Sequence, residues 1–247
     1  MSKIFLANFK MNFNLDDIEN YFENFLRNIN IKNNQVGFFV PYTFLMQTKE
    51  LLKDTKLLIG AQNVHFKESG AFTGEISATM IKNCNADMVL IGHSERRKFF
   101  KETDEEINKK IKKLMKHNLR AVLCIGEKKE ERESGLTDVV IYNQLKATLA
   151  GLYENEFENL IIAYEPVWAI GTGEVASNKI IEDAVTLIRK IIKDLYNSEL
   201  AESTKIIYGG SISSKNCKTL SKIKNINGFL IGGASLNYNE FSEIINS

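Results

Sequence analysis

The sequence lacks a strong net charge, a long apolar run and a cysteine framework, and each absence excludes a class of protein. Its net charge is +1, from 32 basic and 31 acidic residues, so no overall field favours nucleic acid or a membrane surface. No apolar run reaches the length of a membrane span, and Ile4 to Ala7 is too short for a signal peptide. We therefore expect a cytoplasmic protein without a nucleic-acid or membrane partner, which holds any anionic ligand in a local site.

Cysteine is the next scarce residue. Cys84, Cys124 and Cys217 have no metal-ligand spacing, and each lies among apolar or helical residues. Such a pattern is typical of reduced thiols in a cytoplasmic protein. We expect no metal site.

What is present is a regular alternation of short apolar runs with longer amphipathic stretches. The runs predict eight strands: Ile4 to Phe9, Val36 to Val40, Leu57 to Ala61, Met88 to Gly92, Ala121 to Gly126, Leu160 to Glu165, Lys205 to Tyr208 and Phe229 to Gly232. The stretches between them predict eight helices, near 16–29, 42–53, 77–84, 103–117, 137–151, 177–196, 213–222 and 238–245. Helix starts are indicated by Thr103 with Glu106, a capping box, and by Ser177, Ser213 and Asn237.

Length alone does not decide between one large domain and two small ones. Eight strand and helix pairs with no hydrophilic linker or low-complexity tract favour one closed (β/α)8 barrel over residues 1–247, rather than two doubly wound domains. The active face of such a barrel lies at the carboxyl ends of its strands. Unusual polar residues are therefore expected where strands end.

The first and fourth predicted strands end in such residues. Asn8 and Lys10 point the same way because side chains alternate along a strand. These two residues either form an ordinary polar end to the strand, or they bind an anionic or carbonyl oxygen of a ligand. His93 follows the fourth strand and is expected at the N-terminal end of a helical turn, where a neutral imidazole would suit donation to a carbonyl. A lone histidine is often structural, but this position favours a functional role.

Glu165 ends the sixth strand and precedes a loop of small residues. Pro166 should stop the strand, and Ala169 to Gly173 bends easily because two of its five residues are glycine. The carboxylate is either a general base beside a closing loop or one member of a surface salt bridge.

Two glycine pairs follow the last two strands. Gly209 and Gly210 precede Ser211, and Gly232 and Gly233 follow the eighth strand. Such pairs serve turns, but on successive strands of a barrel they favour a nest of N–H groups for phosphate. The set of groups suits proton abstraction next to a carbonyl in a small phosphorylated sugar, and nothing in it requires a cofactor.

The chain resembles the triosephosphate isomerase family over essentially its full length. The resemblance is carried by N-F-K-M-N (8–12), G-A-Q-N (60–63), G-A-F-T-G-E-I-S (70–77), I-G-H-S-E-R-R (91–97), C-I-G-E (124–127), A-Y-E-P-V-W-A-I-G-T-G (163–173), Y-G-G-S (208–211) and the pair 232–233. It implies interconversion of dihydroxyacetone phosphate and D-glyceraldehyde 3-phosphate. The alternatives are another phosphate-binding barrel enzyme, or a barrel kept for binding without catalysis.

The resemblance also implies roles for individual residues. Glu165 matches the base, His93 the neutral electrophile and Lys10 the cation for the developing oxyanion, with Asn8 adding a hydrogen bond. The phosphate-binding positions are Gly171, Ser211, Gly232 and Gly233, and residues 166–176 match a lid that excludes water. Glu95 resembles the buried partner of the lysine, although it could instead pair at the surface with Arg96 or Lys98. Ser94 and Tyr208 are expected to support these groups from behind.

The segment 70–75 reads as a polar hairpin, but in the family it reaches into a second subunit, with Thr73 making the contact, so the resemblance implies a homodimer. Two residues depart from the family pattern. Phe9 stands where tryptophan is usual and lacks an indole N–H. Glu174 stands where lysine is common, and we expect it to face solvent and to change the kinetics of the lid.

Overall fold

The computed structural model describes residues 2–170 and 174–247. Within them, parallel strands close into a barrel in which each strand pairs with its neighbours in the sequence and the last pairs with the first. The strands are β1 (Ile4–Asn8), β2 (Gln35–Val40), β3 (Leu58–Ala61), β4 (Met88–Ile91), β5 (Arg120–Ile125), β6 (Leu160–Tyr164), β7 (Lys205–Gly209) and β8 (Gly228–Ile231). The predicted barrel is confirmed, with strand ends within one residue of expectation.

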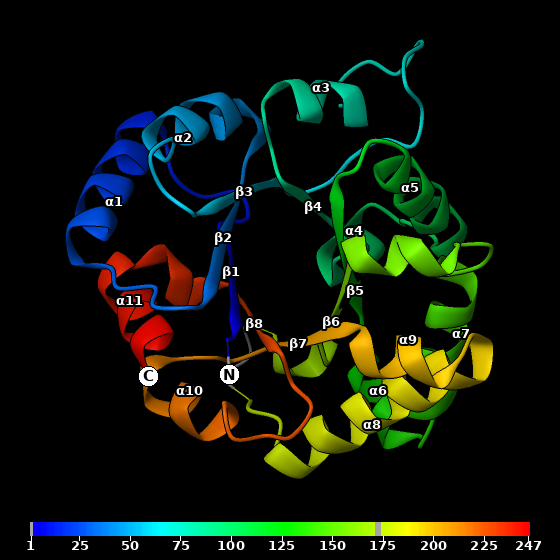
Figure 1. The fold of residues 1–247 in the computed structure, drawn as a ribbon. Coiled ribbons are helices and arrows are strands. Elements are labelled where there is room, and N and C mark those ends of the chain that lie inside the picture. Colours follow the sequence, from blue (N-terminus) through cyan, green and yellow to red (C-terminus); the bar gives the residue numbers. More distant parts are fainter. Residues whose placement is uncertain (1, 171–173) are drawn as a thin grey trace.

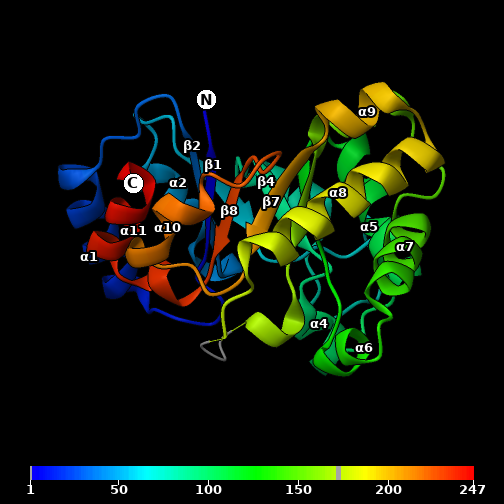
Figure 2. The same cartoon turned by 90° about the horizontal axis from the view of Figure 1, so that it is seen from below.

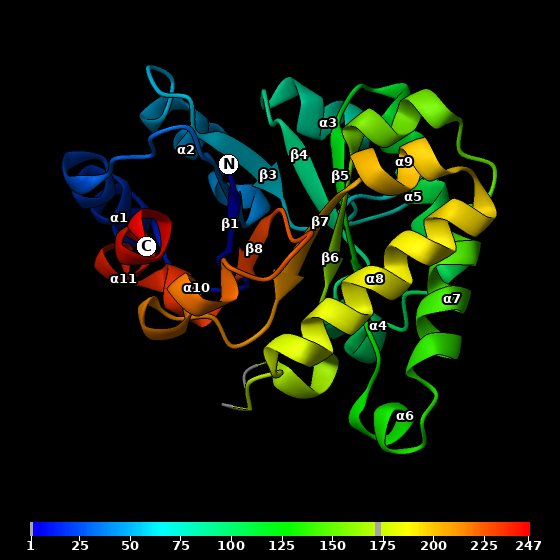
Figure 3. The ribbon, with the colours of Figure 1, turned by 60° about the horizontal axis from the view of Figure 1, so that its bottom comes forward.

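Helices surround this barrel, as Figures 1 and 3 show. They are α1 (Leu15–Asn28), α2 (Leu45–Leu51), α3 (Ala78–Asn83), α4 (Ser94–Phe99), α5 (Asp104–Lys116), α6 (Lys129–Glu133), α7 (Thr137–Thr148), α8 (Asn178–Leu195), α9 (Ser198–Ser203), α10 (Ser214–Leu220) and α11 (Tyr238–Asn246). The predicted starts at Thr103, Ser177, Ser213 and Asn237 are confirmed as N-caps. The short helices α6 and α9 were not predicted because five or six residues are too few to show a helical period, and of α4 only a helical turn beginning at His93 was expected.

The core has two layers. Alternate strand residues point into the barrel and form an inner cluster, which includes Leu6, Leu90, Val122, Ala163 and Leu230. The other strand residues pack outward against the helices. No helix in the described part of the chain combines the length and apolarity that a bilayer crossing requires.

Phe9 belongs to the outer layer. It is fully buried in an aromatic cluster, with its ring centroid 5.0 Å from that of Tyr21 and 5.7 Å from that of Phe38. An indole would bring an N–H group into this apolar setting, where it would need an acceptor. A phenyl ring fits the site without one.

The alternation of inner residues also places the site. In β1, Asn8 follows Ile4 and Leu6 in the inward phase, and beyond β6 Glu165 follows Ile161 and Ala163. Polar residues that follow the inward-pointing residues at a spacing of two, beyond the last apolar layer, point into the mouth of the barrel. Figure 2 shows this end, marked by α4 and α6, opposite the end where the chain begins.

Candidate active site

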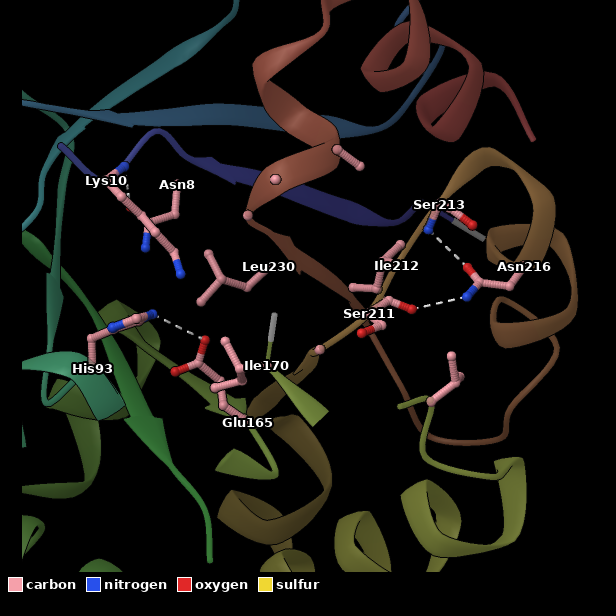
Figure 4. A pocket seen from close by; sticks show the side chains of 15 residues that line it. Asn8, Lys10, His93, Glu165, Ile170, Ser211, Ile212, Ser213, Asn216 and Leu230 are labelled. Carbon is pink, nitrogen blue, oxygen red and sulfur yellow. Dashed lines mark hydrogen bonds and ion pairs between the residues drawn. The ribbon is translucent and has the colours of Figure 1, made fainter. Parts of the chain in front are cut away.

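A cavity of about 320 Å³ lies at the carboxyl ends of the strands, and Figure 4 shows its lining. The predicted residues Asn8, Lys10, His93, Glu165, Ser211, Gly232 and Gly233 all line it. Of the other lining residues, Gly210 belongs to the predicted glycine pair, and Ile170 and Val175 belong to the predicted lid. The sequence did not point to the lining residues Ile212, Ser213, Asn216, Leu230 and Ala234. Gly171 lies outside the described residues.

Glu165 lies just beyond β6 with its side chain only 6% exposed. Its backbone N–H donates to the carbonyl of Ile125 at 2.8 Å, which fixes the residue against the end of β5. One carboxylate oxygen, Oε1, lies 3.5 Å from His93 Nε2. The other, Oε2, is buried without a hydrogen-bond partner among the described residues. A buried carboxylate oxygen with no donor of its own is suited to accept a proton.

His93 is the N-cap of α4, and its ring orientation follows from that position. Its Nδ1 accepts from the backbone N–H of Glu95 at 3.3 Å. A ring nitrogen that accepts a hydrogen bond carries no proton, so Nε2 bears the hydrogen of the neutral ring. Figure 4 shows this nitrogen directed toward Glu165. The imidazole therefore offers an N–H donor to the cavity.

Lys10 has a left-handed backbone, with φ at 51°, which turns the chain at the end of β1. Its backbone N–H donates to Oδ1 of Asn8 at 3.0 Å, and its carbonyl accepts from Gln62 Nε2 at 2.8 Å. Because the Asn8 oxygen is engaged in this way, the side-chain NH₂ group of Asn8 is the part left to serve the cavity.

The ammonium group of Lys10 lies 2.6 Å from Oε1 of Glu95. The structure thus pairs Glu95 with the lysine and not with Arg96 or Lys98. The Glu95 side chain is 42% exposed in the single chain. The family resemblance led us to expect a buried carboxylate, and a single chain does not bury it. This ion pair holds Lys10 at the edge of the cavity.

The glycine-rich ends of β7 and β8 form the opposite wall. Ser211 donates through Oγ to the carbonyl of Ala169 at 2.9 Å, which links this wall to the start of the lid. Asn216 bridges the same loop, since its side chain donates to the carbonyl of Ser211 and accepts from the N–H of Ser213, both at 2.9 Å. The spacing of Ser213 and Asn216, a capping box closed by an amide, is the signal that could have identified Asn216.

Two expected supporting residues lie behind the cavity. Ser94 is the first residue of α4 and lines a separate small space with Cys124 and Glu165. Tyr208 is buried behind Gly210, where burial raises the pKa of its hydroxyl to about 12, although the nearby backbone of Ala176 acts in the opposite direction. A Cβ on Gly210 would lie 2.3 Å from this hydroxyl, so glycine is needed for the close packing.

Glu127 makes buried contacts at the start of residues 166–176 that the sequence did not reveal. Its side chain is fully buried at the end of β5 and accepts from Trp168 Nε1 at 2.9 Å and from the Tyr164 hydroxyl at 3.1 Å. Arg132 lies 3.3 Å from the same carboxylate and stacks over the Trp168 ring. Burial, and secondarily the charge of Glu127, raise the pKa of Tyr164 well above its usual range. The start of the lid is therefore fixed by one paired carboxylate.

The other end of the lid carries Glu174. Its Oε1 lies 3.1 Å from Nζ of Lys129 in α6, and both side chains are about half exposed. The carboxylate thus lies partly in solvent, as expected, but it is paired with α6.

The segment with Thr73 extends away from the body beside α3 (Figure 1), and Thr73 is exposed. Large apolar side chains are exposed elsewhere on the chain, notably Met11 at 96%, Phe99 and Phe100. Met11 and Phe100 border a second cavity with Lys10 and Glu95. Two exposed apolar side chains, Met11 and Phe100, therefore lie beside the lysine among polar residues.

Comparison with known proteins agrees with this geometry. The family profile described as triosephosphate isomerase matches residues 3–247. The chain is 42% identical over 243 residues to a triosephosphate isomerase of Clostridium tetani, which covers 98% of this chain and 95% of the relative. It is 44% identical over 247 residues to one of Malacoplasma penetrans, covering 99% and 98% of the two chains. A third, from Dictyoglomus thermophilum, is 42% identical over 246 residues and covers 99% of each. The chain belongs to the triosephosphate isomerase family.

Proposed function

We propose that this cavity interconverts dihydroxyacetone phosphate and D-glyceraldehyde 3-phosphate. The observation that carries the proposal is the pairing of Glu165, with its buried and unpartnered Oε2, and His93, with an N–H directed into the same cavity. A base and a donor on one small cavity are what proton transfer next to a carbonyl requires. The chain's own side chains and backbone groups fill every role in the proposal, and no cofactor enters it.

In the forward direction, the Glu165 carboxylate removes a proton from C1 of dihydroxyacetone phosphate. The electron pair of that C–H bond forms the C1–C2 double bond, and the C2 carbonyl oxygen takes up the negative charge. Nε2–H of His93 donates to this oxygen, and the Lys10 ammonium stabilises its charge. Glu165 then returns the proton to C2 while the proton of the C1 hydroxyl passes to the C2 oxygen, so the C1 oxygen becomes the aldehyde oxygen and C2 carries the hydroxyl.

The phosphate is assigned to the wall made by Ser211, Gly232 and Gly233. Gly233 lines the cavity, and a Cβ built on it meets no atom within 4 Å, so the space beside its backbone is open. Backbone N–H groups without a neighbouring Cβ approach phosphate oxygens closely. The assignment of Gly171 to the same wall rests on the family pattern alone.

The lid, residues 166–176, is proposed to exclude water during proton transfer. Exclusion of water strengthens the interactions of the enediolate with Lys10 and His93. The Glu127 contacts with Trp168 support this role, because they fix where the lid begins.

A homodimer is part of the same proposal. The Lys10–Glu95 pair lies at an exposed edge beside Met11 and Phe100, and a partner's segment around Thr73 would cover that edge. Covering it would bury Glu95 and strengthen its hold on Lys10. A cytoplasmic location is also proposed, supported by three free cysteines.

The test combines turnover with solution mass. The chain should convert glyceraldehyde 3-phosphate in a coupled assay, and its mass should be twice the 28.1 kDa of one chain. Glu165→Asp shortens the base by one methylene, so we expect kcat to fall by about a hundredfold or more with little change in KM. Glu240→Asp on α11 is the matched control. Wild-type turnover in the Glu165 variant would exclude this residue as the base, whereas a monomeric mass would exclude only the dimer.

A further inference from the structure

The opposite end of the barrel carries another cavity, of about 360 Å³, which no step of the isomerase reaction uses. Its lining comes from the segments that lead into β2, β3 and β5. It lies where strands begin, whereas the active site lies where they end, so the two are separated by the length of the barrel (Figure 2). The lining residues are Ile31, Lys32, Asn33, Asn34, Gln35, Lys56, Leu58 and Arg120.

Three of these residues are cations, and they line one cavity from three separate parts of the chain. Lys32 lies in the turn before β2, Lys56 precedes β3, and Arg120 is the first residue of β5. Across residues 2–170 and 174–247, none of the three side chains has a salt bridge or a hydrogen bond. Like charges around one cavity repel each other, and an anion between them would remove that repulsion.

Carboxylates do not neutralise this cluster. Among the described lining residues there is no aspartate or glutamate. Asp87 directly precedes β4, the strand between β3 and β5. Its Oδ2 already accepts from Lys49 at 3.2 Å and from the N–H of Ile59 at 2.9 Å. The positive charge of the cavity is therefore available to a ligand.

Backbone hydrogen bonds fix the chain at two of these residues, Lys32 and Arg120. Lys32 has φ at 47°, and the turn around it is held by the N–H of Asn34, which donates to the carbonyl of Ile31 at 2.8 Å. Arg120 is held through its N–H, which donates to the carbonyl of Asp87 at 3.2 Å. Exposed side-chain amides of Asn33 and Gln35 add hydrogen-bond donors at the same rim. The arrangement offers a guanidinium fork, two ammonium groups and amides, which is the donor set that phosphate oxygens bind.

We propose that this cavity is a binding site for a small polyanion with at least two adjacent phosphate groups. Three cations exceed what a single phosphate monoester needs. The volume suits a small molecule, and the overall charge of +1 provides no wider basic surface for a nucleic acid. The site is separate from the catalytic cavity, so its occupation leaves the isomerase residues in place.

Tripolyphosphate is the probe, titrated calorimetrically into the full chain at low ionic strength. Saturating glycerol 3-phosphate, which has no carbonyl to isomerise, occupies the catalytic cavity throughout. We expect one tripolyphosphate per chain, bound about tenfold more weakly by the double variant Lys56→Gln/Arg120→Gln and lost in 0.5 M salt. Isomerase turnover of the double variant should equal that of the wild type, which shows that it is folded.

Lys205→Gln is the matched control, since this lysine is exposed at the start of β7, at the same end of the barrel, and does not line the cavity. It should bind tripolyphosphate as the wild type does. Absence of binding to the wild-type chain would overturn the proposal. Equal weakening by Lys205→Gln and by the double variant would also overturn it, because general surface charge would then explain the binding.

Discussion

Nε2 of His93 lies 3.5 Å from Oε1 of Glu165, and both side chains are about 95% buried at the mouth of the barrel. The two residues come from β4 and β6 ends that are separated by β5. Glu165 continues the inward phase of β6, whereas His93 lies out of phase with the inward residues Met88 and Leu90 and follows a turn at Gly92, whose φ is 68°. This distance between Nε2 and Oε1 is longer than a typical hydrogen bond. The two groups therefore do not satisfy each other's hydrogen-bonding capacity, and both remain available to a substrate.

The first prediction concerns the imidazole. Asparagine at position 93 keeps an acceptor for the N–H of Glu95, so α4 retains its cap, but it has no group that reaches as far as Nε2. His93→Asn should therefore fold normally and lose about two to four orders of magnitude in kcat. Steady-state kinetics with the coupled assay measure this loss.

His65→Asn is the matched control for that variant. The Nδ1 of His65 also accepts from a backbone N–H two residues later, that of Lys67, and His65 lies outside the cavity. The control should keep wild-type turnover. Equal activity in the two variants would show that His93 acts only as a helix cap.

The second prediction concerns Gly209, which packs against the base. A Cβ at this position would lie 2.8 Å from Cγ and 3.0 Å from Oε1 of Glu165. Gly209→Ala should displace the carboxylate while leaving its chemistry intact, and a displacement of this order costs about a hundredfold in kcat. KM should change little, because Gly209 does not line the cavity.

Circular dichroism and thermal unfolding would show whether the Gly209→Ala chain is folded. A folded variant with unchanged kcat would mean that Glu165 is free to move by this amount without loss. That result would weaken the proposed dependence of catalysis on its present position.

The fold could be predicted because the inward and outward residues of every strand are apolar, which gives eight short runs that no other pattern mimics. Strand boundaries were accurate to one residue since polar residues begin where the barrel ends. Helix α6 was missed and only a turn of α4 was expected, and their sequences, K-E-E-R-E and S-E-R-R-K-F, explain why. Charged residues without a buried stripe do not distinguish a short helix from a loop.

The site was predictable where a chemically suitable residue also lies at the carboxyl end of a predicted strand, as for Glu165, His93 and Lys10. Asn216 and Ile212 were missed because they act through loop geometry that no periodicity encodes. Glu127 was missed for another reason. A carboxylate at a strand end looks like a second active-site acid, and only its contacts show that it is paired with Tyr164 and Trp168.

The third prediction concerns the end of the lid. Glu174 places a negative charge next to Val175, which lines the cavity for an anionic substrate, and Lys129 neutralises that charge at 3.1 Å. Lys129→Ala should raise KM about two- to fivefold at low salt with kcat nearly unchanged, because a half-exposed pair contributes at most about 1 kcal/mol. The effect should disappear in 0.5 M salt.

Lys128→Ala removes the same charge one residue away and is the matched control. It should leave KM unchanged. The exchange variant Lys129→Glu/Glu174→Lys should restore the wild-type KM if the pair itself matters. An equal rise of KM in both single variants would assign the effect to overall charge.

The fourth prediction concerns the base of the extended segment around Thr73. Glu68 lies 2.8 Å from Lys113 and 2.9 Å from Nε2 of His117, both in or next to α5. Hydrogen bonds from Lys113 first, and then from His117, lower the pKa of Glu68 from 4.5 to about 2. The carboxylate is 37% exposed, so solvent screens part of this interaction.

A carboxyl group whose pKa is lower in the folded chain stabilises it above the unfolded pKa, and this contribution is lost as pH falls through the folded pKa. Glu68→Gln should therefore unfold at a lower urea concentration than the wild type above about pH 5.5, and the difference should narrow as pH falls from about 4.5 toward 2. Both chains must be compared at one protein concentration, because dimer formation adds to apparent stability. A difference that stays constant down to about pH 3 would show that Glu68 stabilises the fold by packing and not by its charge.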